Sequence, residues 1–186
     1  MQKFVEEAGD ALEVEPAGEK DGPTVDDRGV ELIREIDGVE LVRLRPHADN
    51  RGTLIEVLNA TSEFWHEPVV HVYAITVRAG RIKGWGMHKL QADRYCVWSG
   101  SLRVVLYDGR TESPTFGSYL ELWFTDQTPG LLRIPPGVWH ADQNWGEDEA
   151  RIVNFPTRAY DKADPDKYRI DPGSAEIPYD WSLPDG

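Results

Sequence analysis

The sequence predicts an all-β protein whose antiparallel strands close into a barrel or pack as two sheets. Short apolar segments recur at even spacing between residues 39 and 155, turn residues separate them, and no long amphipathic helical pattern interrupts them. The chain has 186 residues, of which 40% are hydrophobic, and this is enough for one sizeable core. We therefore expect one β domain with additional terminal segments.

Eight apolar runs account for the predicted strands. They cover residues 39–44, 53–58, 69–77, 95–98, 102–107, 119–124, 131–134 and 151–155. The run at 102–107 is mostly apolar, which predicts a strand buried on both faces. The short connections contain the Gly, Asn, Asp and Pro residues that tight turns need, as around Gly52, Gly80, Gly100, Gly109 and Gly130.

Two terminal segments flank a predicted barrel of residues 37–158. Residues 1–36 form a predicted acidic arm, because residues 1–27 hold nine acidic residues against two lysines and few aliphatic ones, a composition typical of partly mobile segments. Residues 159–186 contain Pro165, Pro172, Pro178 and Pro184, which predict an irregular cap that includes a short helix or two. We expect this cap to complete the site.

Charge and hydropathy exclude several classes of function. The formal net charge is −13, so the basic clusters that bind a phosphate backbone are missing and we expect no nucleic-acid partner. No run of about 18 apolar residues is present, so we expect no membrane span. The acidic N-terminus lacks the basic end and apolar run of a signal peptide, which predicts a cytoplasmic protein.

Cys96 is the single cysteine of the chain. One thiol can form neither an intrachain disulfide nor a Cys-x-x-Cys redox pair. Its neighbours Tyr95, Val97 and Trp98 predict a buried structural thiol rather than a nucleophile.

A turn followed by a histidine forms the first chemical motif. Its residues are Gly130, Pro135, Gly137, His140 and Asn144, and their spacing resembles the second conserved motif of the cupin superfamily. Upstream, His88 stands alone where metal-binding cupins carry His-x-His. A catalytic zinc or iron site usually has three protein ligands, and only His88, His140 and Gln91 or Asp93 are on offer. We therefore expect no metal ion.

A more specific resemblance covers most of the chain. Its motifs occur in one order, at residues 49–56, 86–91, 108–117 and 134–140 and from Tyr160 to Pro172. Together they resemble the dTDP-4-dehydrorhamnose 3,5-epimerase family, a metal-free branch of the cupins. The resemblance implies a double-stranded β-helix, or cupin jelly roll, that works as a homodimer. It also implies a cofactor-free, metal-independent epimerase whose partner is a nucleotide-activated 4-keto-6-deoxy sugar.

The resemblance implies three catalytic residues. His88 matches the base that removes a carbon-bound proton, Asp171 matches the aspartate that orients it, and Tyr160 matches the acid that returns a proton. These types suit the chemistry, since a carboxylate stabilises an imidazolium and a free phenol, with a pKa of about 10, is normally protonated. Outside a site, Asp171 would open a turn before Pro172 and Tyr160 would be a packing residue.

The resemblance also implies a set of substrate-binding residues. Arg51, together with Lys83 or Arg94, would hold phosphate through the charge-assisted bonds that cations form with it. Arg110 would bind phosphate or pair with Asp108 or Glu112. The remaining candidates for substrate contacts are Glu56, Trp85, Gln91 and His140.

Several positions depart from the family pattern on the ligand side. Trp85 replaces an arginine, and Asp93 aligns with the lysine that polarises the keto oxygen. These changes favour a changed ligand over a broken fold. Two alternatives stay open: a non-catalytic sugar- or metabolite-binding cupin, and a metal-dependent cupin that uses His88, Gln91 and His140.

Overall fold

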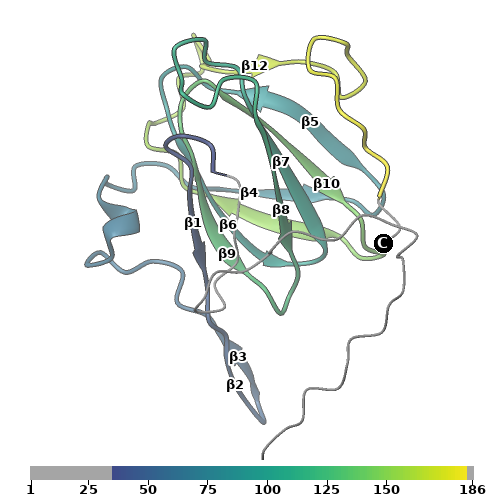
Figure 1. Ribbon diagram of the computed structural model, residues 1–186. Helices are drawn as coiled ribbons and strands as arrows, with labels where there is room; N and C mark the ends of the chain where they lie inside the picture. Colours follow the sequence, from purple (N-terminus) through teal and green to yellow (C-terminus); the bar gives the residue numbers. More distant parts are fainter. Residues whose placement is uncertain (1–34, 184–186) are drawn as a thin grey trace, which may run out of the picture. The chain divides into compact units, whose positions relative to one another are not determined.

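Two five-stranded sheets form most of the computed structural model, which describes residues 35–183 (Figure 1). The first sheet has the order β1-β9-β6-β11-β4 and the second has the order β12-β5-β10-β7-β8. All pairings within these sheets are antiparallel. The predicted all-β jelly roll is confirmed.

The strands are short, as the turn spacing predicts. The first sheet consists of β1 (Glu40–Arg43), β9 (Gly130–Ile134), β6 (Asp93–Ser99), β11 (Ala150–Asn154) and β4 (Tyr73–Val77). The second consists of β12 (Tyr168–Arg169), β5 (Ile82–Met87), β10 (Val138–Asn144), β7 (Leu102–Asp108) and β8 (Tyr119–Phe124). A separate hairpin, β2 (His47–Asp49) and β3 (Gly52–Leu54), extends away from both sheets (Figure 1).

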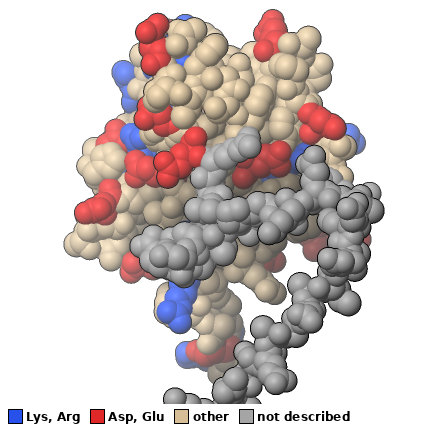
Figure 2. Space-filling model, in the orientation of Figure 1, with Lys and Arg blue, Asp and Glu red and all other residues tan. Residues whose placement is uncertain are grey.

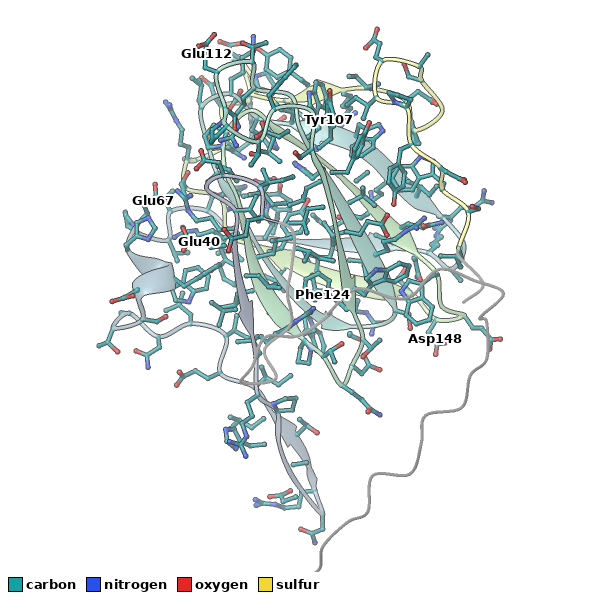
Figure 3. All side chains as sticks on the ribbon, viewed as in Figure 1. Glu40, Glu67, Tyr107, Glu112, Phe124 and Asp148 are labelled. Carbon is teal, nitrogen blue, oxygen red and sulfur yellow. The ribbon has the colours of Figure 1, made fainter. Side chains whose placement is uncertain are left out.

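The core lies between the two sheets. β7 is buried on both faces, as predicted, since Leu102, Val105 and Leu106 are all 0% exposed. Phe124 of β8, labelled in Figure 3, packs on Gly130 of the other sheet, where an added Cβ would lie 2.8 Å from its ring. Cys96 is also buried, and burial raises the pKa of its thiol to about 11, which suits a structural role.

Most of the predicted strands are confirmed, and the errors have a physical cause. Each of the eight predicted runs overlaps an observed strand, and residues 119–124 coincide with β8. The pattern missed β5 and β10, because glycines and polar residues interrupt their apolar runs, and it also missed the short β2 and β12.

The prediction of a helix in the cap is wrong. Residues 159–183 contain β12 and otherwise irregular backbone, because the prolines there lack the amide that a helix needs. The one helix of residues 35–183 is the 3-10 turn η1 (Glu63–Trp65), which precedes β4. The acidic arm lies outside the described residues apart from positions 35 and 36, so the domain boundaries stay predictions.

The surface agrees with the acidic composition. The face in Figure 2 carries Asp and Glu side chains at several separate places and fewer basic ones. No helix among residues 35–183 is long and apolar enough to cross a membrane.

Gly100, in the tight turn between β6 and β7, tests how strictly the turn glycines are required. Its φ is +86°, and an added Cβ would lie 2.5 Å from the Cα of Ala150. Gly100→Ala should lower the free energy of unfolding by about 2–4 kcal/mol, because left-handed backbone strain and overpacking add. Gly80→Ala is the matched control, with a φ of +66° and nothing within 4 Å of the added Cβ, and it should cost about 1 kcal/mol. Urea denaturation measures both losses, and equal losses would contradict the prediction.

Candidate functional site

Two adjoining cavities lie where β5, β6 and β10 meet the C-terminal cap. The inner cavity has a volume of about 540 Å³ and the outer cavity about 500 Å³. Both volumes are within the range of small-molecule sites, which is about 300–1,000 Å³. Four residues line both cavities: Tyr73, His88, Lys167 and Arg169.

The two sheets contribute the inner cavity, and the cap contributes most of the outer one. The other residues of the inner cavity are Ala74, Ile75, Thr76, Lys83, Gly84, Gly86, Asp93, Tyr95, His140 and Asp142. The other residues of the outer cavity are His71, Leu90, Gln91, Pro156, Arg158, Ala159, Tyr160, Asp161, Asp164 and Asp166. A ligand that fills both cavities would therefore touch both sheets and the cap.

Alternation along β5 and β10 explains which side chains face the inner cavity. Lys83 pairs with Asp142 and Gly86 pairs with His140, so a bulge at residues 84–85 places Lys83 and Gly86 on the same face of β5. His88 follows two residues after Gly86 and lies on that face as well. An added Cβ at Gly86 would lie 3.3 Å from His140 Nε2, so glycine here keeps the space in front of His140 open. His140 and Asp142 alternate in the same way along β10, and the pairing of β10 with β5 shifts register between them.

A buried carboxylate joins two histidines in this cavity. Asp93 Oδ2 lies 3.4 Å from His88 Nε2 and 3.6 Å from His140 Nε2, and all three residues are less than 9% exposed. The other carboxylate oxygen, Oδ1, accepts a hydrogen bond of 3.1 Å from Gln91 Nε2. Asp93 is therefore held with Oδ2 facing the two histidines.

The backbone of the cap fixes the second nitrogen of His88. His88 Nδ1 donates a hydrogen bond to the backbone oxygen of Asp166. The Asp166 carboxylate accepts hydrogen bonds from the amides of Lys89, at 2.9 Å, and Leu90, at 2.7 Å. With the proton on Nδ1, a neutral His88 presents the lone pair of Nε2 to the cavity.

The charges of this group follow from burial and from Asp93. Burial lowers the pKa of His88, but the hydrogen bond and charge of Asp93 outweigh it and raise the pKa above 6.5. Burial lowers the pKa of His140 to about 4, so this ring is neutral at pH 7. Burial raises the pKa of Asp93, but the two histidines outweigh it and bring the pKa to about 2. At neutral pH, Asp93 is an anion beside a neutral His140 and beside His88, whose protonated form it favours.

Asp142 is a second buried carboxyl group of the inner cavity. It is 4% exposed, and its Oδ1 has no hydrogen-bond partner among the described residues. Burial and the nearby charge of Asp93 raise its pKa to about 7, while Lys83 and Lys167 act in the opposite direction. Such a carboxyl is partly protonated at neutral pH, which distinguishes it from Asp93.

Five of the residues proposed from the sequence lie in this pair of cavities. Lys83 and His140 line the inner cavity, Gln91 and Tyr160 line the outer one, and His88 lines both. Tyr160 is 58% exposed at the outer wall. The structure thus brings the proposed base and acid to one cavity, and their roles stay predictions.

The expected pair of His88 and Asp171 is wrong for this structure. The partners of His88 are Asp93 and the Asp166 backbone, whereas Asp171 is exposed and its Oδ1 accepts a hydrogen bond of 2.8 Å from the Gly173 amide. The Asp-Pro turn explains the difference, because Pro172 packs against Gly84 and directs the chain past β5 at that level. Asp93 takes the position beside the imidazole instead.

Two predicted phosphate ligands point elsewhere in this chain. Arg94 is 0% exposed and donates to the backbone oxygens of Glu67, Pro68 and Phe155, at 2.7–3.0 Å, because it alternates with the inward-facing Asp93. The side chain of Arg51 is 84% exposed and pairs with Asp49 at the tip of the β2–β3 hairpin. Neither lines the two cavities.

Three more predicted substrate contacts also lie away from the cavities. Arg110 pairs with Asp108 at 2.8 Å, the alternative that its neighbours suggested. Trp85 is 0% exposed, because it faces the side of β5 opposite Gly86 and packs against Ala141 and Ile177. Glu56 accepts a hydrogen bond of 3.2 Å from Asn59 in the exposed loop after β3. All three have local structural partners instead.

The same group could hold a metal ion. One ligand atom each from His88, Asp93 and His140 lie within 4.8 Å of one another. Two histidines and one carboxylate form a donor set that suits several divalent transition metals. Of the ligands weighed from the sequence, Asp93 therefore fits better than Gln91, which donates to Asp93.

Sequence reasoning missed Asp142 and several residues of the cap that line the site, among them Asp166 and Arg158. Asp142 stands two residues after His140, so the alternation of a strand would have placed it on the same face. Lys167 and Arg169 come from the cap, whose path no sequence pattern gives. The negative net charge of the whole chain gives no indication that basic residues gather at this site.

Comparisons with known proteins agree with this geometry. A family model described as dTDP-4-dehydrorhamnose 3,5-epimerase matches residues 34–185. The chain is 34% identical over 149 residues to the "Probable low-salt glycan biosynthesis epimerase Agl13" of Haloferax volcanii, which covers 79% of this chain and 95% of that protein. It is 32% identical over 151 residues to the "Spore coat polysaccharide biosynthesis protein SpsL" of Bacillus subtilis, with 79% and 97% covered.

A solved structure supports the same relation. The crystal structure of a dTDP sugar isomerase from Desulfovibrio desulfuricans G20 superposes with a TM-score of 0.73 at 29% sequence identity. The superposition covers 81% of this chain and 94% of that chain.

Asp142 gives a pH-dependent prediction for stability. Its pKa is raised from 3.8 to about 7 on folding, so its favourable contribution is fully present below pH 3.8 and is lost as the pH rises through about 7. Asp142→Asn has no carboxyl group to ionise, so the variant does not lose this stability as the pH rises. The Tm of the variant minus the Tm of the unsubstituted protein should therefore increase by about 5 °C from pH 5 to pH 8. Differential scanning calorimetry measures this change.

A matched control uses an exposed carboxyl group. Asp148, labelled in Figure 3, lies in the exposed turn between β10 and β11. Asp148→Asn should show the same Tm difference from the unsubstituted protein at both pH values. A Tm difference for Asp142→Asn that does not change with pH would contradict the raised pKa.

Proposed function

The chain belongs to the dTDP-4-dehydrorhamnose 3,5-epimerase family. We therefore propose that it inverts the configuration at a carbon atom next to the 4-keto group of a nucleotide-activated 6-deoxy sugar. Family and relatives make it an epimerase, an enzyme of the isomerase class. The reaction needs a base, a group that stabilises the enolate oxygen, and an acid. The contact between His88 and Asp93, at the wall that both cavities share, is the observation that supports this proposal best.

His88 is the proposed base. Its Nδ1–H is bound to the Asp166 backbone, so Nε2, which lies 3.4 Å from Asp93 Oδ2, carries the lone pair that accepts a proton from the sugar carbon. Once it is protonated, the imidazolium lies beside the Asp93 carboxylate, which stabilises it. The raised pKa of His88 reflects the same interaction, because Asp93 favours the protonated form.

Tyr160 is the proposed acid, and basic side chains are the proposed phosphate ligands. Tyr160 lines the outer cavity together with His88, so a sugar placed there lies between them. Arg158 and Arg169 line the same cavity, and their guanidinium groups suit the two phosphates of a nucleotide diphosphate. Lys83, in the inner cavity, stays a candidate ligand.

The relatives suggest the class of sugar. Their names place them in the biosynthesis of glycan and of spore coat polysaccharide. We propose that this chain likewise acts on a dTDP-linked sugar destined for a polysaccharide or glycan, and that it works in the cytoplasm without a metal ion. The absence of a side chain at Gly86, in front of His140, supports a sugar that fills the inner cavity.

Loss of the base tests the proposal. The protein is incubated in deuterium oxide with dTDP-4-keto-6-deoxyglucose, and NMR follows deuterium at the two carbons beside the ketone. His88→Asn should lower the rate of incorporation by about 10²–10⁴-fold, the usual contribution of general base catalysis. The variant keeps a side chain that can hydrogen-bond to Asp166, so its Tm should change little.

An exposed histidine supplies the control. The side chain of His66 is 50% exposed at the end of η1, and His66→Asn should leave the rate unchanged. No incorporation by the unsubstituted protein at either carbon would sink the proposed reaction for this sugar.

A homodimer is the second part of the proposal. All six residues of β2 and β3 are exposed, and within residues 35–183 these strands pair only with each other. Leu54 on β3 is 64% exposed. Because an isolated two-stranded hairpin is marginally stable in water and its edges invite pairing, a second copy of the chain is the proposed partner for this surface.

Light scattering after size exclusion tests the dimer. The unsubstituted protein should elute with twice the chain mass of 21.1 kDa. Leu54→Asp places a charge on the proposed apolar contact and should shift the mass toward that of one chain. A monomeric unsubstituted protein at micromolar concentration would contradict the dimer.

A further inference from the structure

The proposed reaction requires a positive charge or a hydrogen-bond donor beside the keto oxygen of the substrate. When His88 removes a proton from carbon, negative charge develops on the keto oxygen, and a cation or hydrogen-bond donor has to face that oxygen. Asp93, which stands where the resemblance implies a lysine, is itself an anion that contacts both histidines. A cation from another part of the chain is therefore needed near His88.

Two basic side chains near His88 already have other interaction partners. Lys89 Nζ lies 4.6 Å from the centre of the Tyr168 ring, outside both cavities. Arg94 is bound to three backbone oxygens on the far side of β6. Neither is placed to meet a sugar beside His88.

Four basic residues line the cavities: Lys83 only the inner one, Arg158 only the outer one, and Lys167 and Arg169 both. Lys83 lines the inner cavity and Tyr160 the outer one, so Lys83 shares no cavity with the proposed acid. Lys167 and Arg169 line both cavities, and His88 does so as well. A lysine ammonium is a compact charge that suits one oxygen atom, whereas the guanidinium fork suits the oxygens of phosphate. Lys167 is the better match to a keto oxygen.

The backbone on both sides of Lys167 is attached to the end of β5. Asp166 binds His88 Nδ1 through its backbone oxygen and the amides of Lys89 and Leu90 through its carboxylate. Tyr168 pairs with Met87. The α-carbon of Lys167 is therefore fixed relative to the proposed base, while its side chain reaches into the shared part of the cavities.

The charges around Lys167 agree with such a role. Partial burial and the neighbouring Arg169 lower its pKa, and Asp93 and Asp142 act against them. The charge of Lys167 in turn opposes protonation of His88. Lys167 therefore helps to keep the imidazole in the neutral form that a base requires.

We propose that Lys167 is a catalytic residue that donates a hydrogen bond to the keto oxygen and stabilises the enolate. The inference rests on the proposed epimerase function. The electron pair of the broken C–H bond forms the C=C bond of the enolate, the carbonyl pair moves onto the oxygen beside Lys167, and His88 Nε2 takes the proton. When the enolate collapses, carbon takes a proton from the acid on the other face, and both groups exchange with water before the next turnover.

Chemical rescue of a cysteine variant tests this role. Lys167→Cys should lower kcat for deuterium incorporation by about 10²–10³-fold, the usual loss for one donor to a developing oxyanion. Treatment with 2-bromoethylamine, in which the thiolate displaces bromide, restores an ammonium group at nearly the original length and should recover at least tenfold of that loss. The native Cys96 is 0% exposed with a pKa raised to about 11, so the new thiol is the one that reacts.

The controls separate charge from shape and chemistry from folding. Iodoethane places an uncharged group of similar size on the same thiol and should recover nothing. Lys167→Met should reproduce the loss with an unchanged Tm, and Lys162→Met, at an exposed position of the cap loop, should retain full activity with the same change in net charge.

Three outcomes decide the matter. Selective recovery by the amine supports Lys167 as the cation. A kcat of Lys167→Met within threefold of that of the unsubstituted protein, or equal recovery by both reagents, overturns it while the epimerase function stands. No incorporation by the unsubstituted protein overturns the proposed function, and the role of Lys167 falls with it.

Discussion

The attachment of Asp166 to the end of β5 is the constraint on which the geometry of the site depends. Its backbone oxygen accepts the hydrogen bond of His88 Nδ1, and its carboxylate binds the amides of Lys89 and Leu90. Hydrogen bonds to a charged acceptor contribute about 1.5–3 kcal/mol each, so this attachment is strong for a loop. One residue thus sets the tautomer of the proposed base, the place of Lys167 and the wall that both cavities share.

The charges of the site come from two sources that meet only in the folded chain. The barrel supplies the buried acids, Asp93 from β6 and Asp142 from β10, and the cap supplies Lys167 and Arg169. Burial of two acids in one cavity is costly, and the raised pKa of Asp142 shows that the nearby lysines compensate it only in part. The cap adds carboxylates as well, since Asp161, Asp164 and Asp166 line the outer cavity beside these basic residues.

The sequence predicted the barrel better than the site, because hydrophobic patterning identifies the core strands but not the strands that line the inner cavity. Apolar runs identify strands such as β7 and β8, but β5 and β10 carry the glycines and polar residues that form the inner cavity, so the hydrophobic pattern fails where the chemistry lies. Motif spacing nevertheless found His88 and His140, because it depends on residue type rather than on hydropathy. It did not find Lys167, since the partner of a strand residue in an irregular cap is set by tertiary contacts.

Trp85 shows how the cap and the altered ligand side are related. The resemblance expects an arginine there, yet the indole faces away from the cavity and packs with Val105, Ala141 and Ile177, and with Trp181 at a ring distance of 5.4 Å. Burial of an aromatic ring of this size stabilises the contact between β5 and the cap by about 2–3 kcal/mol. The replacement therefore exchanges a cation for an anchor of the cap, and the cap in turn carries Lys167 and Arg169 to the cavity.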